Sequence, residues 1–242
     1  MATAWLTSIT LAWHPLLTFE RKRLSFLDWV DENIDFIGFS KREDEIGLSL
    51  GSGVRLEARR SQASLTLDHM ATWSDAEALL RGLMEILQPR HPRVMVVSGQ
   101  WSGDTVDVSY DKARRAVARN AALGDHASFR SIDTSILLDF SGPGAEMQCE
   151  LGVVTASELQ DRLRHAGSMS RLKTAPQPLL RELDPYVLPD VSVYAGVTWV
   201  PDEARYDSVP EMEAKYTEGM RASRELVDSL DRALAAEMRS EP

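Results

Sequence analysis

Two periods of hydrophobic residues along the chain predict both strands and helices. Val54, Leu56 and Ala58 alternate with charged neighbours, and this period of two indicates a half-buried strand. Between residues 76 and 87 the apolar residues instead recur every three or four positions, as on one face of an amphipathic helix. Pro89 ends that pattern, since proline cannot continue a helix. The chain therefore combines strands with helices.

The same two periods return in the second part of the chain. Alternating stretches predict strands, and longer stretches with helical spacing predict a short and a very long helix. The predicted strands are 132–140, 147–153 and 191–199, and the predicted helices are 155–163 and 208–238. Residues 167–190 contain four prolines and predict an irregular crossing segment.

Four short motifs of the form Ser/Thr-x-x-Glu/Asp predict where helices begin. In such a capping box the first side chain accepts a backbone hydrogen bond from the fourth residue, and the fourth side chain accepts one in return. The four boxes are Ser25 to Asp28, Ser74 to Glu77, Thr155 to Glu158 and Ser208 to Glu211. Each follows a strand-like stretch, so the boxes predict sheets alternating with helices.

These patterns predict an α+β fold. We expect two similar halves of mainly antiparallel sheet, because short turns cannot form parallel crossovers, with helices on one face and a long C-terminal helix. The predicted units are 1–124 and 125–242, and the pattern also allows them to form one compact unit.

The composition of the chain indicates which class of partner it could bind, but not which reaction it could catalyse. The chain has 37 acids and 27 bases, a net charge of −10 and a pI near 5.0, which disfavours nucleic acid and suits a basic protein partner. The single cysteine, Cys149, excludes an intrachain disulfide and favours the reducing cytosol. The first residues do not form a signal peptide and no apolar run is long enough to span a membrane, so we expect a cytoplasmic protein.

The sequence supplies no pattern that is specific for catalysis, a cofactor or a metal. Gly51–Gly53 lacks the Lys-Ser/Thr of a phosphate loop and predicts a hairpin turn. Residues 99–104 do not match a nucleophile elbow and predict a loop. The five histidines form no metal-binding pair, and Cys149 lies on the apolar side of a predicted strand. These observations favour a non-enzymatic function without excluding an enzyme.

Candidate interaction residues fall into three groups. Trp101 lies in the predicted loop and anchors a partner if it is exposed, but it can equally fold back onto the core. A locally basic helix could hold an acidic partner, although such a face is usually only solvated. The basic residues are Lys112, Arg115 and Arg119, and the acidic candidates on the long helix are Glu211, Glu218, Glu225 and Asp228.

The long helix also carries an apolar seam close to a heptad pattern. Its members are Met212, Tyr216, Met220, Ser223, Val227, Leu230 and Leu234. A polar residue at a seam position and Gly219 inside the helix weaken the coiled-coil interpretation. Packing on the protein's own sheet is therefore favoured over a homodimer through this helix.

The favoured function is that of an acidic protein-interaction module, of the immunity or inhibitor type, that captures a basic protein. Electrostatic attraction accelerates such encounters. Two alternatives stay open: an enzyme with a pocket between the two halves, or an oligomerising subunit of a phage or secretion assembly.

Overall fold

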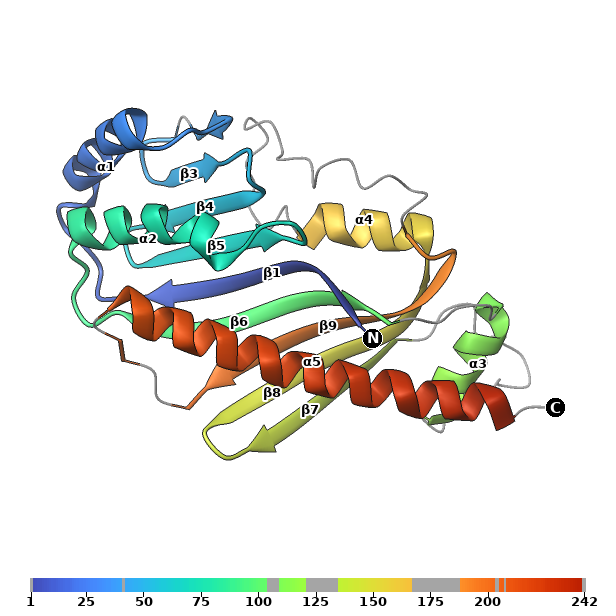
Figure 1. Ribbon diagram of the computed structural model, residues 1–242. Coiled ribbons are helices and arrows are strands. Elements are labelled where there is room, and N and C mark those ends of the chain that lie inside the picture. The colour runs from blue at the N-terminus through green and yellow to red at the C-terminus, as the bar shows by residue number, and fades with distance from the viewer. Residues whose placement is uncertain are drawn as a thin grey trace.

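The computed structural model describes residues 2–40, 42–103, 109–120, 135–166, 188–202, 205–206 and 208–240. Within these residues the chain forms one nine-stranded antiparallel sheet and five helices (Figure 1), which confirms the α+β prediction. In chain order the elements are β1 (Thr3–Ala12), α1 (Phe19–Asn33), β2 (Gly38–Phe39), β3 (Ile46–Ser49), β4 (Val54–Arg59), β5 (Gln62–Asp68), α2 (Trp73–Leu87), β6 (Arg93–Ser102), α3 (Tyr110–Asn120), β7 (Ser135–Gly142), β8 (Ala145–Thr155), α4 (Ala156–Ala166), β9 (Val191–Pro201) and α5 (Val209–Ser240).

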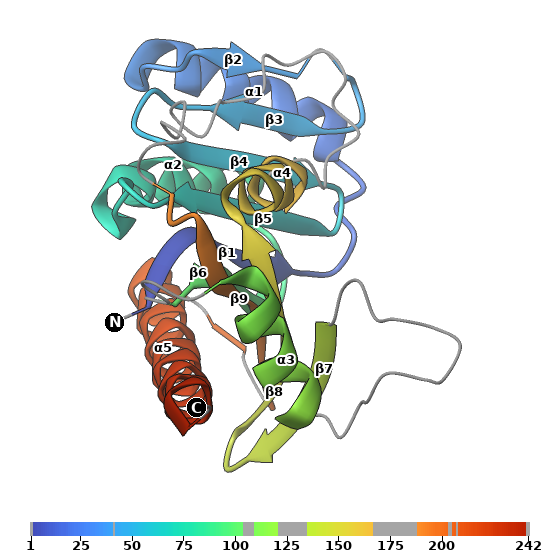
Figure 2. The same cartoon turned by 90° about the vertical axis from the view of Figure 1, so that its right-hand side faces the viewer.

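The strand order in the sheet is β2-β3-β4-β5-β1-β6-β9-β8-β7. Strands β2 to β5 form an antiparallel meander, and the Gly51–Gly53 segment is the predicted turn between β3 and β4. Strand β1 lies between β5 and β6, so the start of the chain is in the middle of the sheet. Figure 2 shows β2 and α1 at one end of the sheet and β7 at the other.

Strand β6 joins the two predicted units into one sheet. Its residues Val97 to Ser102 pair with Trp199 to Tyr194 of β9. Strands from both 1–124 and 125–242 therefore share a continuous hydrogen-bonded ladder. The expected similarity of two halves is not seen in this arrangement and stays a prediction, as does the domain boundary.

Four helices pack on one face of the sheet. Side chains of α1, α2 and α5 share a core with Ile9, Leu11 and Val97, and α3 packs beside them against β8 and α5. Alternation along a strand puts neighbouring residues on opposite faces. Ala195 accordingly contacts the α3 and α5 side, whereas Tyr194 contacts α4.

The prediction that all helices lie on one face is therefore wrong for α4. It covers one end of the other face, where Trp5 and Leu6 at a bulge in β1 supply apolar partners. Elsewhere this face is polar in the middle of the sheet, where the hydroxyls of Ser8 and Ser98 are 2.7 Å apart.

Helix α5 is 32 residues long and crosses β6 and β9. Its seam faces the sheet, because Met212, Ser223 and Val227 are buried there. The prediction that this helix packs on its own sheet is confirmed. A homodimer through α5 would have to use its opposite, solvent-facing side.

The capping boxes differ in outcome. Thr155 to Glu158 caps α4, with the Thr155 N–H donating to Glu158 Oε2 at 2.8 Å, and Ser208 Oγ accepts the Glu211 N–H at 3.4 Å before α5. The other two predictions are wrong. Helix α2 is capped by Thr72 with Asp75, two residues before Ser74. Helix α1 begins after Thr18, so Ser25 lies inside that helix.

The prediction of a loop at residues 99–104 is wrong for residues 99–102, which belong to β6. Strand β6 continues to Ser102 without a turn, because residues 99–102 pair with β1 on one side and β9 on the other. A β-carbon on Gly99 would lie 2.4 Å from Trp101 Nε1, so this glycine serves a close contact rather than a turn. Residue 104 of the predicted loop and most of the predicted crossing segment 167–190, namely 167–187, lie outside the described residues. In the part of the chain that is described, no helix is long and apolar enough to cross a membrane.

Candidate functional site

The strongest candidate for a binding surface lies at the β2 end of the sheet, where α1 ends. Phe26 and Val30 of α1 are buried against α2 and the sheet. These two side chains hold α1 so that its opposite side faces solvent. After α1 the chain turns back into β2. We call the exposed part of this region the acidic edge: Asp28, Asp31, Glu32, Asp35, Ile37 and Phe39.

The charge of this surface has one sign. Residues 24–40 contain four acids and no base. All four carboxylates are exposed, and none of them forms an ion pair with the residues that the structure describes. The negative charge is therefore available to a partner.

These acids oppose the dipole of the helix that carries them. The C-terminal end of a helix bears a partial negative charge, so Asp31 and Glu32 in the last turn of α1 are placed unfavourably by roughly 0.3–1 kcal/mol each. No basic residue in that turn offsets them. Helix stability does not account for their position, which is a reason to look for a role in binding.

Two apolar side chains lie beside the acids. Ile37 is 61% exposed and Phe39 is 45% exposed, although both belong to the short segment that forms the sheet edge. The backbone of this segment is fixed, since the Ile37 N–H donates to the Ser49 carbonyl at 2.8 Å. Phe36 contacts Phe39 edge-on, with ring centroids 6.0 Å apart. The surface thus offers apolar contact area on a rigid support.

The acids predicted on α5 form a weaker candidate. Glu211 and Glu225 are exposed, but Glu218 pairs with Lys215 at 2.6 Å and Asp228 accepts the Ala2 N–H at 2.9 Å. Exposed Arg221, Arg224 and Arg232 also lie among them. The solvent side of α5 therefore has mixed charge.

The remaining predicted interaction residues do not come together. Trp101 is 0% exposed, so the hypothesis of an exposed anchor is wrong and the ring instead packs in the core beside α3 and α5. Its one notable polar neighbour is Arg224, whose guanidinium lies 5.8 Å from the ring centroid. On α3, Arg115 is exposed and Lys112 is half-buried, and the Arg119 side chain lies outside the described residues.

The described residues also include the side chains that could ligate a metal or act as a nucleophile. No group of three His, Cys, Asp or Glu side chains there could hold a metal ion. Asp68 caps the following turn by accepting the N–H groups of Met70 and Ala71, both at 2.9 Å, rather than orienting His69. Cys149 is buried, as predicted, and burial followed by the charge of Glu150 raises its pKa to about 11.

Comparison with known proteins leaves the family open. No family model matches the chain, and no curated protein matches it. Among solved structures, one similarity is to a rolling-circle replication initiator protein from Geobacillus stearothermophilus, with 6% sequence identity over 84% of this chain and 76% of that one. The TM-score of 0.30 is too low for a shared fold, so nothing about function is transferred.

Proposed function

We propose that this protein is an acidic protein-interaction module of the immunity or inhibitor type, which captures a basic partner protein through the acidic edge. One observation carries the proposal. Unpaired carboxylates are gathered at the end of α1 where the helix dipole disfavours them, directly beside exposed Ile37 and Phe39.

The two components of this surface suit different stages of binding. Carboxylates on a rim steer an oppositely charged protein and raise the association rate, whereas desolvated apolar side chains mainly slow dissociation. A basic partner with a shallow apolar patch among its lysines and arginines would match both. The single cysteine agrees with a cytosolic site of action, which is part of the proposal.

The test begins with the protein products of neighbouring reading frames as candidate partners. Once a complex is found, stopped-flow association is measured at low and at high salt. We expect the rate to fall at least about tenfold, because salt screens steering by exposed charges. A rate independent of salt would contradict electrostatic capture.

The variant Asp31→Asn/Glu32→Gln locates the surface. We expect it to slow association by about tenfold while its melting temperature stays equal or rises, since two charges opposed to the helix dipole are removed. The matched control is Glu211→Gln/Glu225→Gln, which removes the same charge from α5. If only the α5 variant slows association, the acidic edge is not the binding surface.

The alternative functions make different predictions. An oligomerising subunit would form defined oligomers of this chain, and light scattering at high concentration measures this directly. An enzyme would require a cleft with converging reactive groups. The acidic edge supports neither.

A further inference from the structure

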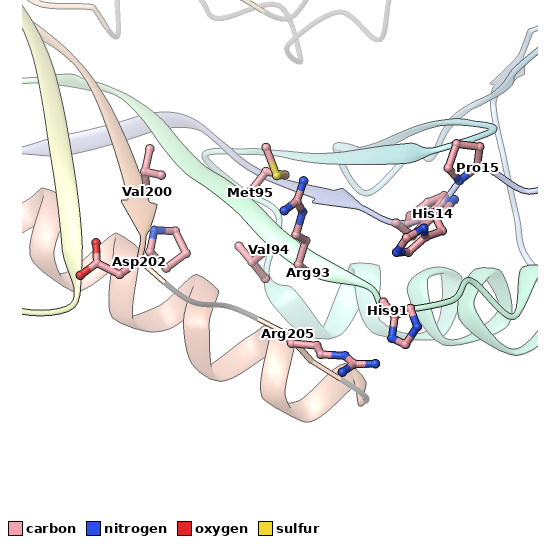
Figure 3. Close-up of a pocket in the computed structure, with 11 residues that line it drawn as sticks. His14, Pro15, His91, Arg93, Val94, Met95, Val200, Asp202 and Arg205 are labelled. Carbon is pink, nitrogen blue, oxygen red and sulfur yellow. The ribbon is translucent and has the colours of Figure 1, made fainter.

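A cleft of about 900 Å³ lies away from the acidic edge. It opens where β1 ends, β6 begins and β9 leads towards α5 (Figure 3). Among the described residues its walls come from residues 13–15, 91, 93–95, 200–202 and 205, so both predicted halves contribute to it.

Backbone hydrogen bonds hold the walls of this cleft in place. The His14 N–H donates to the Arg90 carbonyl at 3.2 Å, and the Tyr206 N–H donates to the Pro92 carbonyl at 3.0 Å. The backbones of Arg93 and Arg205 also pair as an antiparallel bridge. The chain segments that carry the cationic side chains are therefore fixed relative to one another before any ligand arrives.

The cleft is lined by an excess of cationic and hydrogen-bond-donating groups. Arg93 and Arg205 contribute two guanidinium groups, neither of which has a carboxylate partner among the residues described, and Asp202 is the one acid among the described residues of the lining. The rings of His14 and His91 lie edge to face with centroids 5.2 Å apart. In a protein of net charge −10, this inversion of sign marks a place for an anion.

The backbone at His91 strengthens this interpretation. His91 has φ of +54°, a left-handed conformation that costs a non-glycine residue roughly 1 kcal/mol or more. Its imidazole is exposed and contacts that of His14.

One wall of the cleft is apolar. Met95 is 41% exposed and Val200 is 39% exposed, although both are apolar. Figure 3 shows Met95 beside Arg93 and Val200 towards Asp202, with Asp202 at the opposite end of the view from the histidine pair. A small inorganic ion would leave this apolar wall uncovered.

We propose that this cleft binds an organic phosphate about the size of a nucleoside monophosphate. Arg93, Arg205 and the two imidazoles donate charge-assisted hydrogen bonds to the phosphate oxygens. Met95 and Val200 contact the apolar part of the ligand, and Asp202 accepts a hydrogen bond from one of its hydroxyl or amino groups. The site is independent of the acidic edge and of any protein partner.

Isothermal titration with AMP, adenosine and inorganic phosphate tests the proposal on the full chain. We expect AMP to bind measurably, and adenosine and inorganic phosphate each to bind at least about tenfold more weakly, since each lacks one half of the recognised chemistry. Adenosine binding as tightly as AMP overturns the phosphate site. Inorganic phosphate binding as tightly as AMP overturns the role of the apolar wall. No binding of AMP up to about 10 mM overturns the proposal as a whole.

Charge-removing variants then locate the site. Arg93→Gln and Arg205→Gln should each weaken AMP binding by about tenfold, whereas Arg221→Gln, the same change on the exposed side of α5, should leave it within about twofold. Circular dichroism and the melting temperature verify that each variant is folded. AMP binding that both cleft variants leave unchanged would contradict the assignment. Association with a protein partner measures the acidic edge separately, so either proposal can fail without the other.

Discussion

The buried position of Cys149 determines the reactivity of its thiol. It lies on β8 in the core shared with α3 and α5, and its side chain is fully buried. Burial penalises the thiolate, and the neighbouring charge of Glu150 adds to this, so the pKa of the thiol rises to about 11. A thiol that stays protonated is a poor nucleophile, so Cys149 is a packing residue.

The first prediction concerns this thiol. At pH 8 the native protein should react with a thiol reagent far more slowly than the unfolded chain, which exposes the thiol and restores its usual pKa. Because the native pKa lies above the unfolded value of 9.0, the contribution of the thiol to stability is complete below about pH 9 and is lost as the pH rises through about 11. Labelling kinetics with and without denaturant measure the first effect. Rapid labelling of the native protein would contradict the buried position.

At the scale of elements, α5 depends on a glycine inside a helix. Gly219 lies where the helix crosses the sheet, and a β-carbon there would be 2.9 Å from Val97 Cβ and 2.7 Å from the ring of Trp199. Glycine disfavours a helix by about 1 kcal/mol relative to alanine. The close approach of α5 to β6 and β9 explains why the position is not alanine.

Gly219→Ala should therefore destabilise the protein even though alanine is the better helix former. We expect a loss of about 1–3 kcal/mol in the free energy of unfolding, because the helix must move away from two strands. The control is Ala214→Gly on the exposed side of α5, which should lose about 1 kcal/mol through helix propensity alone. Denaturant unfolding measures both. A stabilised Gly219→Ala protein would show that the helix is not held at this distance.

The sequence predicted elements best where a periodic apolar pattern was long. The stripe from Ala76 to Leu87 gave α2, and the alternation around Cys149 gave β8. Short motifs were less reliable because they overlap: Thr72 to Asp75 and Ser74 to Glu77 both fit a capping box, and only the first forms. Such a choice depends on which turn of the helix can be buried, which a four-residue motif does not contain.

The candidate sites were predictable only in part. The absence of bases between residues 24 and 40 is visible in the sequence, and it could have directed attention to α1 rather than to α5. The exposure of Ile37 and Phe39 was not visible, since it depends on β2 being an edge strand. The cleft joins three segments far apart in the chain, and their proximity is a consequence of strand order that no local pattern encodes.

At the scale of the whole molecule, the continuous sheet predicts cooperative unfolding. Leu80 on α2 and Val227 on α5 are both buried, one in each predicted unit. Leu80→Ala and Val227→Ala should each leave a single unfolding transition and reduce the free energy of unfolding. We expect a loss of roughly 2–4 kcal/mol for the leucine and less for the smaller valine. Calorimetry together with near-ultraviolet circular dichroism measures this. Two separated transitions, each sensitive to only one variant, would show that 1–124 and 125–242 unfold independently.

The position of β6 between β1 and β9 has a consequence for how the protein is made. During synthesis β6 can pair with β1 early, but its other edge has to wait for β9, roughly ninety residues later in the chain. Until then the nascent chain exposes an unpaired strand edge and the buried side of Trp101. Pairings between such distant strands also close slowly. Aggregation during translation, rather than low stability of the finished fold, is therefore the hazard that this topology creates.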